Sequence, residues 1–176
     1  MTSTENNTRT IQVYSVYIKA TPQAIWDALT KPEWSEKYGY AGLVDVDLRP
    51  GGQFRMHANA GMKAHPGVPD IISDGEVIES DPPRKLVLTW HMVMTPDLAA
   101  EAFTHLTYEI EEGRGGVTKL TVTHDLTGAP AFAAVTGGKL ASEGAGGGWS
   151  EILSGLKTLL ETGQQLPFQS GRPLPA

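Results

Sequence analysis

The chain contains no cysteine, and this absence excludes several kinds of chemistry at once. Disulfide bonds, thiolate metal ligands and cysteine nucleophiles all need a thiol, so none is available to these 176 residues. No run of lysine or arginine occurs either, and the net charge is −6. Because phosphate binding needs a basic surface, no nucleic-acid partner is predicted.

Long apolar runs are absent as well. No stretch approaches the roughly 20 apolar residues of a membrane-spanning helix, so no membrane span is predicted. Residues 1–10 are polar and lack the apolar segment of a signal peptide, which predicts a soluble, cytoplasmic protein. No His-Glu-x-x-His, Gly-x-Ser-x-Gly or dinucleotide-binding glycine pattern occurs, so neither a metal site nor a cofactor is predicted.

Apolar and β-branched residues instead follow the pattern of strands separated by turn residues. Pro50-Gly51-Gly52 joins two of these strands, and proline residues end another after Asp81. The predicted strands cover residues 10–19, 43–48, 53–58, 71–79, 85–91, 104–111 and 117–125.

Two short helices are predicted directly after the first strand. Thr21 can cap the first helix, and Pro22 suits its first position because proline lacks an N–H group. Pro32 begins the second. Segment 59–70 is expected to be a loop, and segment 92–103 a loop or frayed extensions of the neighbouring strands. The glycine- and alanine-rich segment 127–148 is expected to hold at most a helical turn near residues 131–135.

A long amphipathic helix is predicted near the C-terminus, ending before Gly163 as a left-handed cap. Its apolar residues recur at the spacing of one helix face; they are Trp149, Ile152, Leu153, Leu156, Leu159 and Leu160. Because successive strands are joined by short turns, the sheet is expected to be an antiparallel meander, and the apolar helix face must pack on it. The predicted class is α+β, with a ligand site where side chains fail to fill the space between sheet and helix.

The proposed folded unit is one domain over residues 10–163, flanked by flexible tails at 1–9 and 164–176. Homodimerisation through an exposed strand is a further possibility that this pattern leaves open.

The order of these elements resembles the START-like (SRPBCC) superfamily, and within it the branch named after the activator of heat-shock-protein-90 ATPase. The segments that carry the resemblance are residues 20–30, 50–55, 75–90, 118–124 and 148–161. The resemblance implies a helix-grip fold, in which six to seven curved antiparallel strands surround the C-terminal helix. Members include lipid and hormone carriers and polyketide cyclases. The resemblance therefore implies a protein with an internal ligand cavity more than a particular activity.

Aromatic and sulfur-containing side chains are the candidate ligand contacts, since they offer large or adaptable apolar surface. Trp26 is expected to be a core residue, and Trp149 is also expected to contribute to core packing. The predicted ligand-binding residues are Trp34, Tyr38, Met56, Trp90, Tyr108, His124 and Trp149.

Two residues are weak catalytic candidates. Pairing Leu106 with Val122 across the turn at 113–116 would place His124 on the inward face, as either a core histidine or a ligand contact. Glu76 could act as a buried acid or base, but periodicity leaves the inward face of strand 71–79 undecided.

Three functions are therefore compared. The first is binding of a small hydrophobic or aromatic molecule without turnover. The second is a cyclase- or hydrolase-type enzyme that uses the same cavity, and the third is a co-chaperone-like interaction module.

Overall fold

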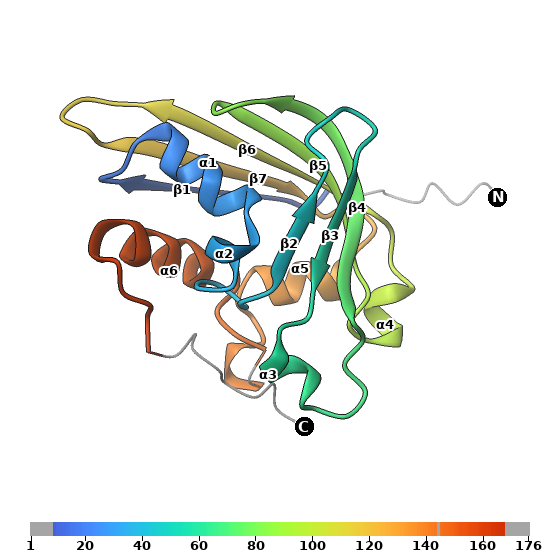
Figure 1. The fold of residues 1–176 in the computed structure, drawn as a ribbon. Coiled ribbons are helices and arrows are strands. Elements are labelled where there is room, and N and C mark those ends of the chain that lie inside the picture. The colour runs from blue at the N-terminus through green and yellow to red at the C-terminus, as the bar shows by residue number, and fades with distance from the viewer. Residues whose placement is uncertain (1–8, 144, 168–176) are drawn as a thin grey trace.

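The computed structural model describes residues 9–143 and 145–167, and a curved antiparallel sheet dominates this part of the chain (Figure 1). Its seven strands follow the order β1-β7-β6-β5-β4-β3-β2, a meander from β2 to β7 with β1 added beside β7. The strands are β1 (Ile11–Ile18), β2 (Leu43–Val46), β3 (Gln53–His57), β4 (Ile71–Asp81), β5 (Lys85–Met92), β6 (Thr104–Glu112) and β7 (Thr118–Asp125). The predicted α+β helix-grip fold is confirmed.

Helices α1 (Pro22–Thr30) and α2 (Pro32–Ser35) follow the first strand, as the sequence predicts. The Thr21 side chain accepts a hydrogen bond from the backbone N–H of Ala24, so it caps α1 as expected. Helix α6 (Gly148–Thr162) lies on the same side of the sheet as α1 and contacts both α1 and β1 (Figure 1).

Four of the six predicted residues on the apolar face of α6 are buried, and Ile152 and Leu160 are partly buried. Trp149, Leu153, Leu156 and Leu159 are all at most 5% exposed and pack in the core that joins the sheet to α1. Gly163 adopts φ 73° and donates its N–H to the Leu159 carbonyl, so it is the predicted left-handed cap.

Three segments expected to be irregular hold short helices. They are α3 (Ala60–Lys63), α4 (Pro96–Ala99) and α5 (Pro130–Thr136), the last followed by a 3₁₀ turn (Ala141–Glu143). Side-chain caps stabilise two of them: Asn59 caps α3 and Thr95 caps α4. A one-turn helix is too short to show periodicity, so apolar spacing alone does not reveal it.

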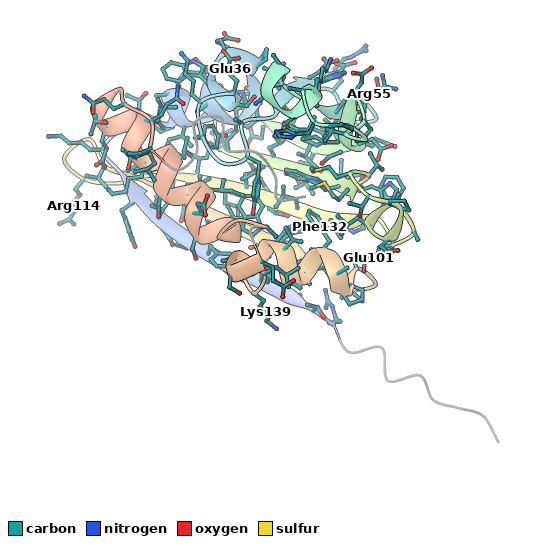
Figure 2. All side chains as sticks on the ribbon, turned by 90° about the horizontal axis from the view of Figure 1, so that it is seen from below. Glu36, Arg55, Glu101, Arg114, Phe132 and Lys139 are labelled. Atoms are coloured by element: carbon teal, nitrogen blue, oxygen red, sulfur yellow. The ribbon has the colours of Figure 1, made fainter. Side chains whose placement is uncertain are left out.

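Helix α5 is tied to the chain before β6 by a carboxylate. Both carboxylate oxygens of Glu101 accept hydrogen bonds from backbone N–H groups in the first turn of α5, from Ala131 at 2.7 Å and from Phe132 at 2.9 Å. Figure 2 shows Glu101 beside this turn and Phe132 between α5 and the sheet, far from Arg114 on the β6–β7 turn. Phe132 is 4% exposed, so α5 closes one end of the interior.

The pairing of β6 with β7 differs from the predicted register by two residues. Leu106 lies opposite His124, and Glu112 lies opposite Thr118. The strands continue closer to the turn than expected, because Gly113 donates its N–H to the Val117 carbonyl and closes a tight loop. A two-residue shift preserves the faces of a strand, so His124 still points inward.

The structure also settles which face of β4 is inside. Ser73 and Val77 are fully buried, whereas Glu76 and Ile78 are exposed on the outer face. Inside-facing carboxylates on this strand were one of two alternatives, and that alternative is wrong for Glu76.

Strands β1 and β2 form the two edges of the sheet. Homodimerisation and the single domain over 10–163 stay predictions, and the expected tails lie mostly outside the described residues. Within the described ranges, no helix is both long and apolar enough to cross a membrane.

Candidate functional site

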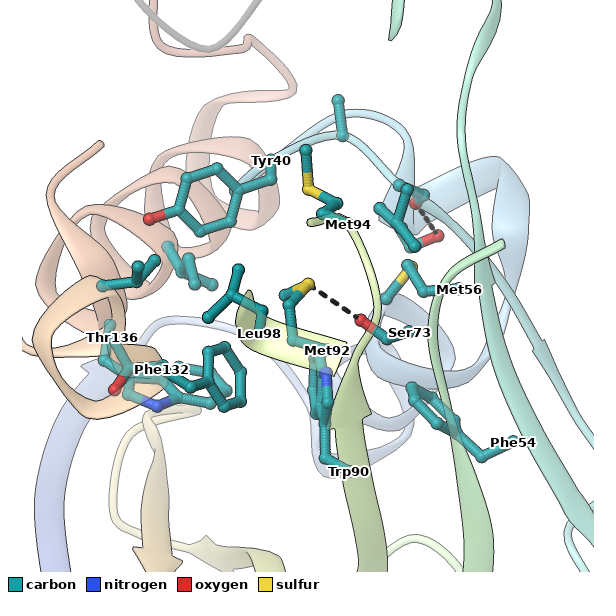
Figure 3. A pocket seen from close by; sticks show the side chains of 18 of the residues that line it. Tyr40, Phe54, Met56, Ser73, Trp90, Met92, Met94, Leu98, Phe132 and Thr136 are labelled. Carbon is teal, nitrogen blue, oxygen red and sulfur yellow. Dashed lines mark hydrogen bonds between the residues drawn. The ribbon is translucent and has the colours of Figure 1, made fainter. Parts of the chain in front are cut away.

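A pocket of about 220 Å³ opens between the inner face of the sheet, the start of α6 and the segments around α4 and α5; we call it the main pocket (Figure 3). Its lining includes five of the seven predicted ligand contacts, namely Tyr38, Met56, Trp90, Tyr108 and Trp149. Residues far apart in the sequence meet here because the inner faces of β3, β5 and β6 point toward α6.

Trp90 is the centre of the aromatic lining. Its ring lies 5.3 Å from Phe54 and 6.4 Å from both Phe132 and Trp149, measured between ring centroids. Trp149 in turn meets Tyr108 edge-on at 6.1 Å. Aromatic pairs prefer such tilted and edge-on arrangements, so these rings hold one another in place and form a firm wall.

Methionine side chains form a softer part of the lining. Met56 comes from β3, Met92 from the end of β5 and Met94 from the following loop, while α3 contributes Met62. A thioether side chain is flexible and polarizable, so this side of the pocket can adapt to the shape of a guest.

Several lining residues were not predicted from the sequence. They lie on α4, which was expected to be part of a loop, and on α5, of which only a helical turn near residues 131–135 was expected. Leu98 reaches the pocket from α4, and Phe132, Val135 and Thr136 reach it from α5. The capping residues and the Pro96 and Pro130 helix starts were the available signals.

Tyr40 was also missed, although it fastens one side of the pocket. Its hydroxyl donates to the Ala145 carbonyl at 3.1 Å and accepts the backbone N–H of Gly148 at 3.2 Å. Burial raises the pKa of Tyr40, as it does the pKa of Tyr38 and of Tyr108. These lining phenols therefore stay protonated and neutral at ordinary pH.

The described lining contains no Asp, Glu, Lys, Arg or His side chain. Its polar groups are hydroxyls, backbone groups and the indole nitrogen of Trp90. An ion would lose its hydration in such a place and find no counter-charge, so the lining favours neutral guests.

His124 does not line the pocket but lies behind the aromatic rings of Trp90 and Trp149. It is fully buried, and its Nδ1 accepts a hydrogen bond from Trp149 Nε1 at 3.2 Å. Its Nε2 lies 2.8 Å from the Thr104 hydroxyl, which donates to the Trp90 carbonyl at 2.8 Å. Since Nδ1 must accept and the Thr104 hydrogen is used elsewhere, Nε2 carries the hydrogen and the ring is neutral.

Burial lowers the pKa of His124 to about 4, and the negative charge of Asp125 opposes this shift only partly. With both ring nitrogens engaged and a neutral ring, His124 holds Trp149 in place. Of its two predicted roles, a core histidine is the one this geometry matches.

Two other predicted site residues lie elsewhere. Trp34 is on α2, where Lys37 Nζ sits 5.2 Å from its ring centre, and it borders a separate depression beside Leu159 and Leu160. Helix α2 has only four residues, so its apolar face could not be oriented from spacing. Glu76 is exposed on the outer face of β4, where it cannot reach the pocket.

Metal-binding side chains do not gather in the described ranges. No group of three or more His, Asp or Glu residues there is placed to hold an ion. His91, on the outer face of β5, instead contacts Asp74 and the Ala99 carbonyl, each at 3.1 Å.

Residues 19–161 match the model of a family described as Activator of Hsp90 ATPase homolog 1-like protein. Among curated proteins, none matches this chain.

Many solved structures share the fold. CalU16 from Micromonospora echinospora has a TM-score of 0.61 at 18% identity, with 92% of this chain and 88% of that chain covered. The protein encoded by gene BPP1335 from Bordetella parapertussis has a TM-score of 0.62 at 23% identity, with coverages of 90% and 78%. PFC0360w, described as an HSP90 activator from Plasmodium falciparum, has a TM-score of 0.58 at 18% identity, with coverages of 85% and 95%. At these identities the likeness shows the fold alone.

Proposed function

This chain belongs to the family of activator of Hsp90 ATPase homolog 1-like proteins, within the START-like superfamily, and we propose that it uses this fold to bind a small, neutral, apolar or aromatic molecule. The proposed site is the main pocket, and the proposed contacts include Met56, Trp90, Tyr108 and Trp149.

The observation that carries this proposal is the composition of the lining. Aromatic and methionine side chains surround a space that no charged side chain of the described residues enters. Burying apolar surface stabilises a complex by about 25 cal/mol per Å², whereas an ion would pay a large desolvation cost here.

The volume of the pocket limits the size of the guest. An engineered apolar cavity of about 150 Å³ in another protein stays dry and binds benzene. By that comparison the 220 Å³ pocket has room for a guest of roughly ten heavy atoms, such as a two-ring hydrocarbon. The methionines allow somewhat larger shapes.

Binding is favoured over turnover because the described part of the lining offers no group that could exchange protons near neutral pH. The titratable side chains of the described lining are tyrosines with raised pKa values. A general acid or base works best when its pKa lies near the operating pH. Neither His124 nor Glu76 reaches the pocket to supply one.

A chaperone-binding function is the second candidate, and the family description is the observation that favours it. Ile11, Val13 and Tyr17 lie on one face of the edge strand β1 and are 45%, 61% and 61% exposed. They offer an apolar contact for such a partner. Titration with purified Hsp90, comparing the wild type with Val13→Lys, tests this candidate.

Calorimetric titration with naphthalene tests the proposed function. Leu98→Trp adds volume inside the pocket, and Ile78→Trp makes a similar change on the outer face of β4 as a matched control. We expect the wild type and Ile78→Trp to bind alike, and Leu98→Trp to bind at least about tenfold more weakly. Absence of binding by the wild type, or equal binding by Leu98→Trp, would contradict the proposal.

A further inference from the structure

Two hydrogen-bond donors in the main pocket lack good acceptors. Trp90 Nε1 is buried and has no hydrogen-bond partner among the described residues. The Ser73 side chain is fully buried, and its hydroxyl is directed to Met92 Sδ at 3.6 Å. A thioether sulfur is a weak acceptor, and buried donors normally have a good partner, so both groups call for an explanation.

The two donors lie near each other on the inner face of the sheet. Ser73 on β4 is paired with Met92 on β5, and Trp90 is two residues before Met92 on the same face. Such diagonal neighbours are separated by about 7–8 Å, which long side chains can span.

Met92 covers both donors. Figure 3 shows its side chain next to Ser73 and next to the end of the Trp90 ring that carries the indole nitrogen. Because a methionine side chain changes rotamer easily, it can move aside and expose both groups to a guest.

We propose that the guest carries a neutral carbonyl oxygen, which accepts hydrogen bonds from Trp90 Nε1 and Ser73 Oγ once Met92 moves aside. This inference rests on the proposed function and narrows it from any apolar molecule to an apolar ketone or a related carbonyl compound.

A carbonyl oxygen suits this place better than water or a hydroxyl group does. A water molecule that accepted from both donors would leave its own two hydrogens facing Met92 and aromatic rings. A carbonyl oxygen accepts two hydrogen bonds and has no hydrogen to satisfy.

The test compares two probes of nearly equal shape, indane and 1-indanone, which differ in one carbonyl group. Their dissociation constants are measured by calorimetry for the wild type, for Trp90→Phe and for Trp34→Phe. The last variant makes the same change outside the main pocket. The readout is the ratio of the two dissociation constants, because it cancels effects of the substitution on general apolar binding.

We expect Trp90→Phe to shift this ratio against 1-indanone by about fivefold, the size of one hydrogen bond, and Trp34→Phe to leave it unchanged. Ser73→Ala should shift it in the same direction. If Trp90→Phe leaves the ratio unchanged while both probes bind, the carbonyl inference is wrong and the proposed function survives. If neither probe binds the wild type, both fail.

If Trp90→Phe does not fold, a measurement on the wild type tests whether the carbonyl of the guest accepts a hydrogen bond from Trp90 Nε1. The chain has four tryptophans, so its indole N–H signals are few in a ¹⁵N-correlated NMR spectrum. We expect 1-indanone to move the Trp90 indole proton downfield, and indane not to do so. Equal changes with both probes would overturn the inference.

Discussion

Trp149 Nε1 donates a hydrogen bond to His124 Nδ1 across 3.2 Å, which joins the first turn of α6 to the inner face of β7. The same contact fixes the tautomer of the histidine, since a nitrogen that accepts cannot carry a hydrogen. His124 Nε2 then donates to Thr104, whose hydroxyl donates to the Trp90 carbonyl. This series of hydrogen bonds thus holds Trp149 and Trp90 in place from the side that faces away from the pocket.

The stability of the protein is predicted to fall as His124 is protonated. Its folded pKa of about 4 lies below the ordinary value of 6.5, so the unfolded chain binds this proton more readily. The contribution of neutral His124 to the free energy of unfolding is therefore complete above about pH 6.5. It is lost as the pH falls toward 4, by up to about 3 kcal/mol. Urea unfolding at a series of pH values measures it.

His124→Gln is the comparison for this measurement, because glutamine has no proton to gain. Carboxyl groups such as Asp125, whose pKa is lowered by its hydrogen bonds to Thr127, contribute to both proteins at lower pH. The difference between the two pH profiles isolates the histidine. A wild-type profile parallel to that of His124→Gln between pH 4 and 6.5 would show that His124 is not buried in its neutral form.

Removing the indole donor is predicted to destabilise the fold through His124. In Trp149→Phe a smaller aromatic ring replaces the indole and His124 Nδ1 loses its partner, and an unsatisfied buried group costs about 1–3 kcal/mol. The same change in a His124→Leu background should cost less, because no acceptor is left unpaired. Chemical unfolding of the four proteins gives the coupling energy, and a coupling near zero would mean that the two side chains act independently.

Replacing Trp34 is predicted to leave ligand binding intact. Trp34→Ala removes the contact with Lys37 and the packing of the indole against the core, so it costs about 1–3 kcal/mol of stability at this partly exposed site. Because the residue lies outside the main pocket, the affinity for naphthalene should stay within about twofold of the wild type. A large loss of affinity measured by calorimetry would restore Trp34 to the binding site.

His91 is predicted to hold α4 against the sheet. Its ring stacks on Phe103 at 4.4 Å, while its nitrogens contact Asp74 and the Ala99 carbonyl. His91→Phe keeps the stacking and removes both polar contacts. We expect amide hydrogen exchange in residues 96–101 to become roughly fivefold faster, the size of one lost hydrogen bond. Unchanged exchange there would show that α4 is held by its other contacts, such as those of Leu98.

The sequence predicts those features that repeat along the chain. The alternation in the strands and the stripe of α6 determine which side chains face inward, and a two-residue error in pairing β6 with β7 did not change the face of His124. Trp90 and Tyr108 could be placed in this way, since each lies within a long, regular strand.

Features that depend on a single turn could not be predicted. Trp34 lies on a four-residue helix and Leu98 on another, and neither shows enough of a period to orient its side chain. For Glu76 the two faces of β4 were equally plausible, because both mix apolar and polar residues. The neighbours of β4 decide that Ser73 and Val77 are inside.

Anomalous diffraction from crystals soaked in bromobenzene tests the central claim most directly, because bromine reports where an apolar guest lies. We predict a strong peak inside the main pocket, between Trp90, Met56 and Leu98. Leu98→Trp crystals treated in the same way should lack this peak. Bromine found only on the outer surface of a wild-type crystal, with the interior unoccupied, would contradict the account.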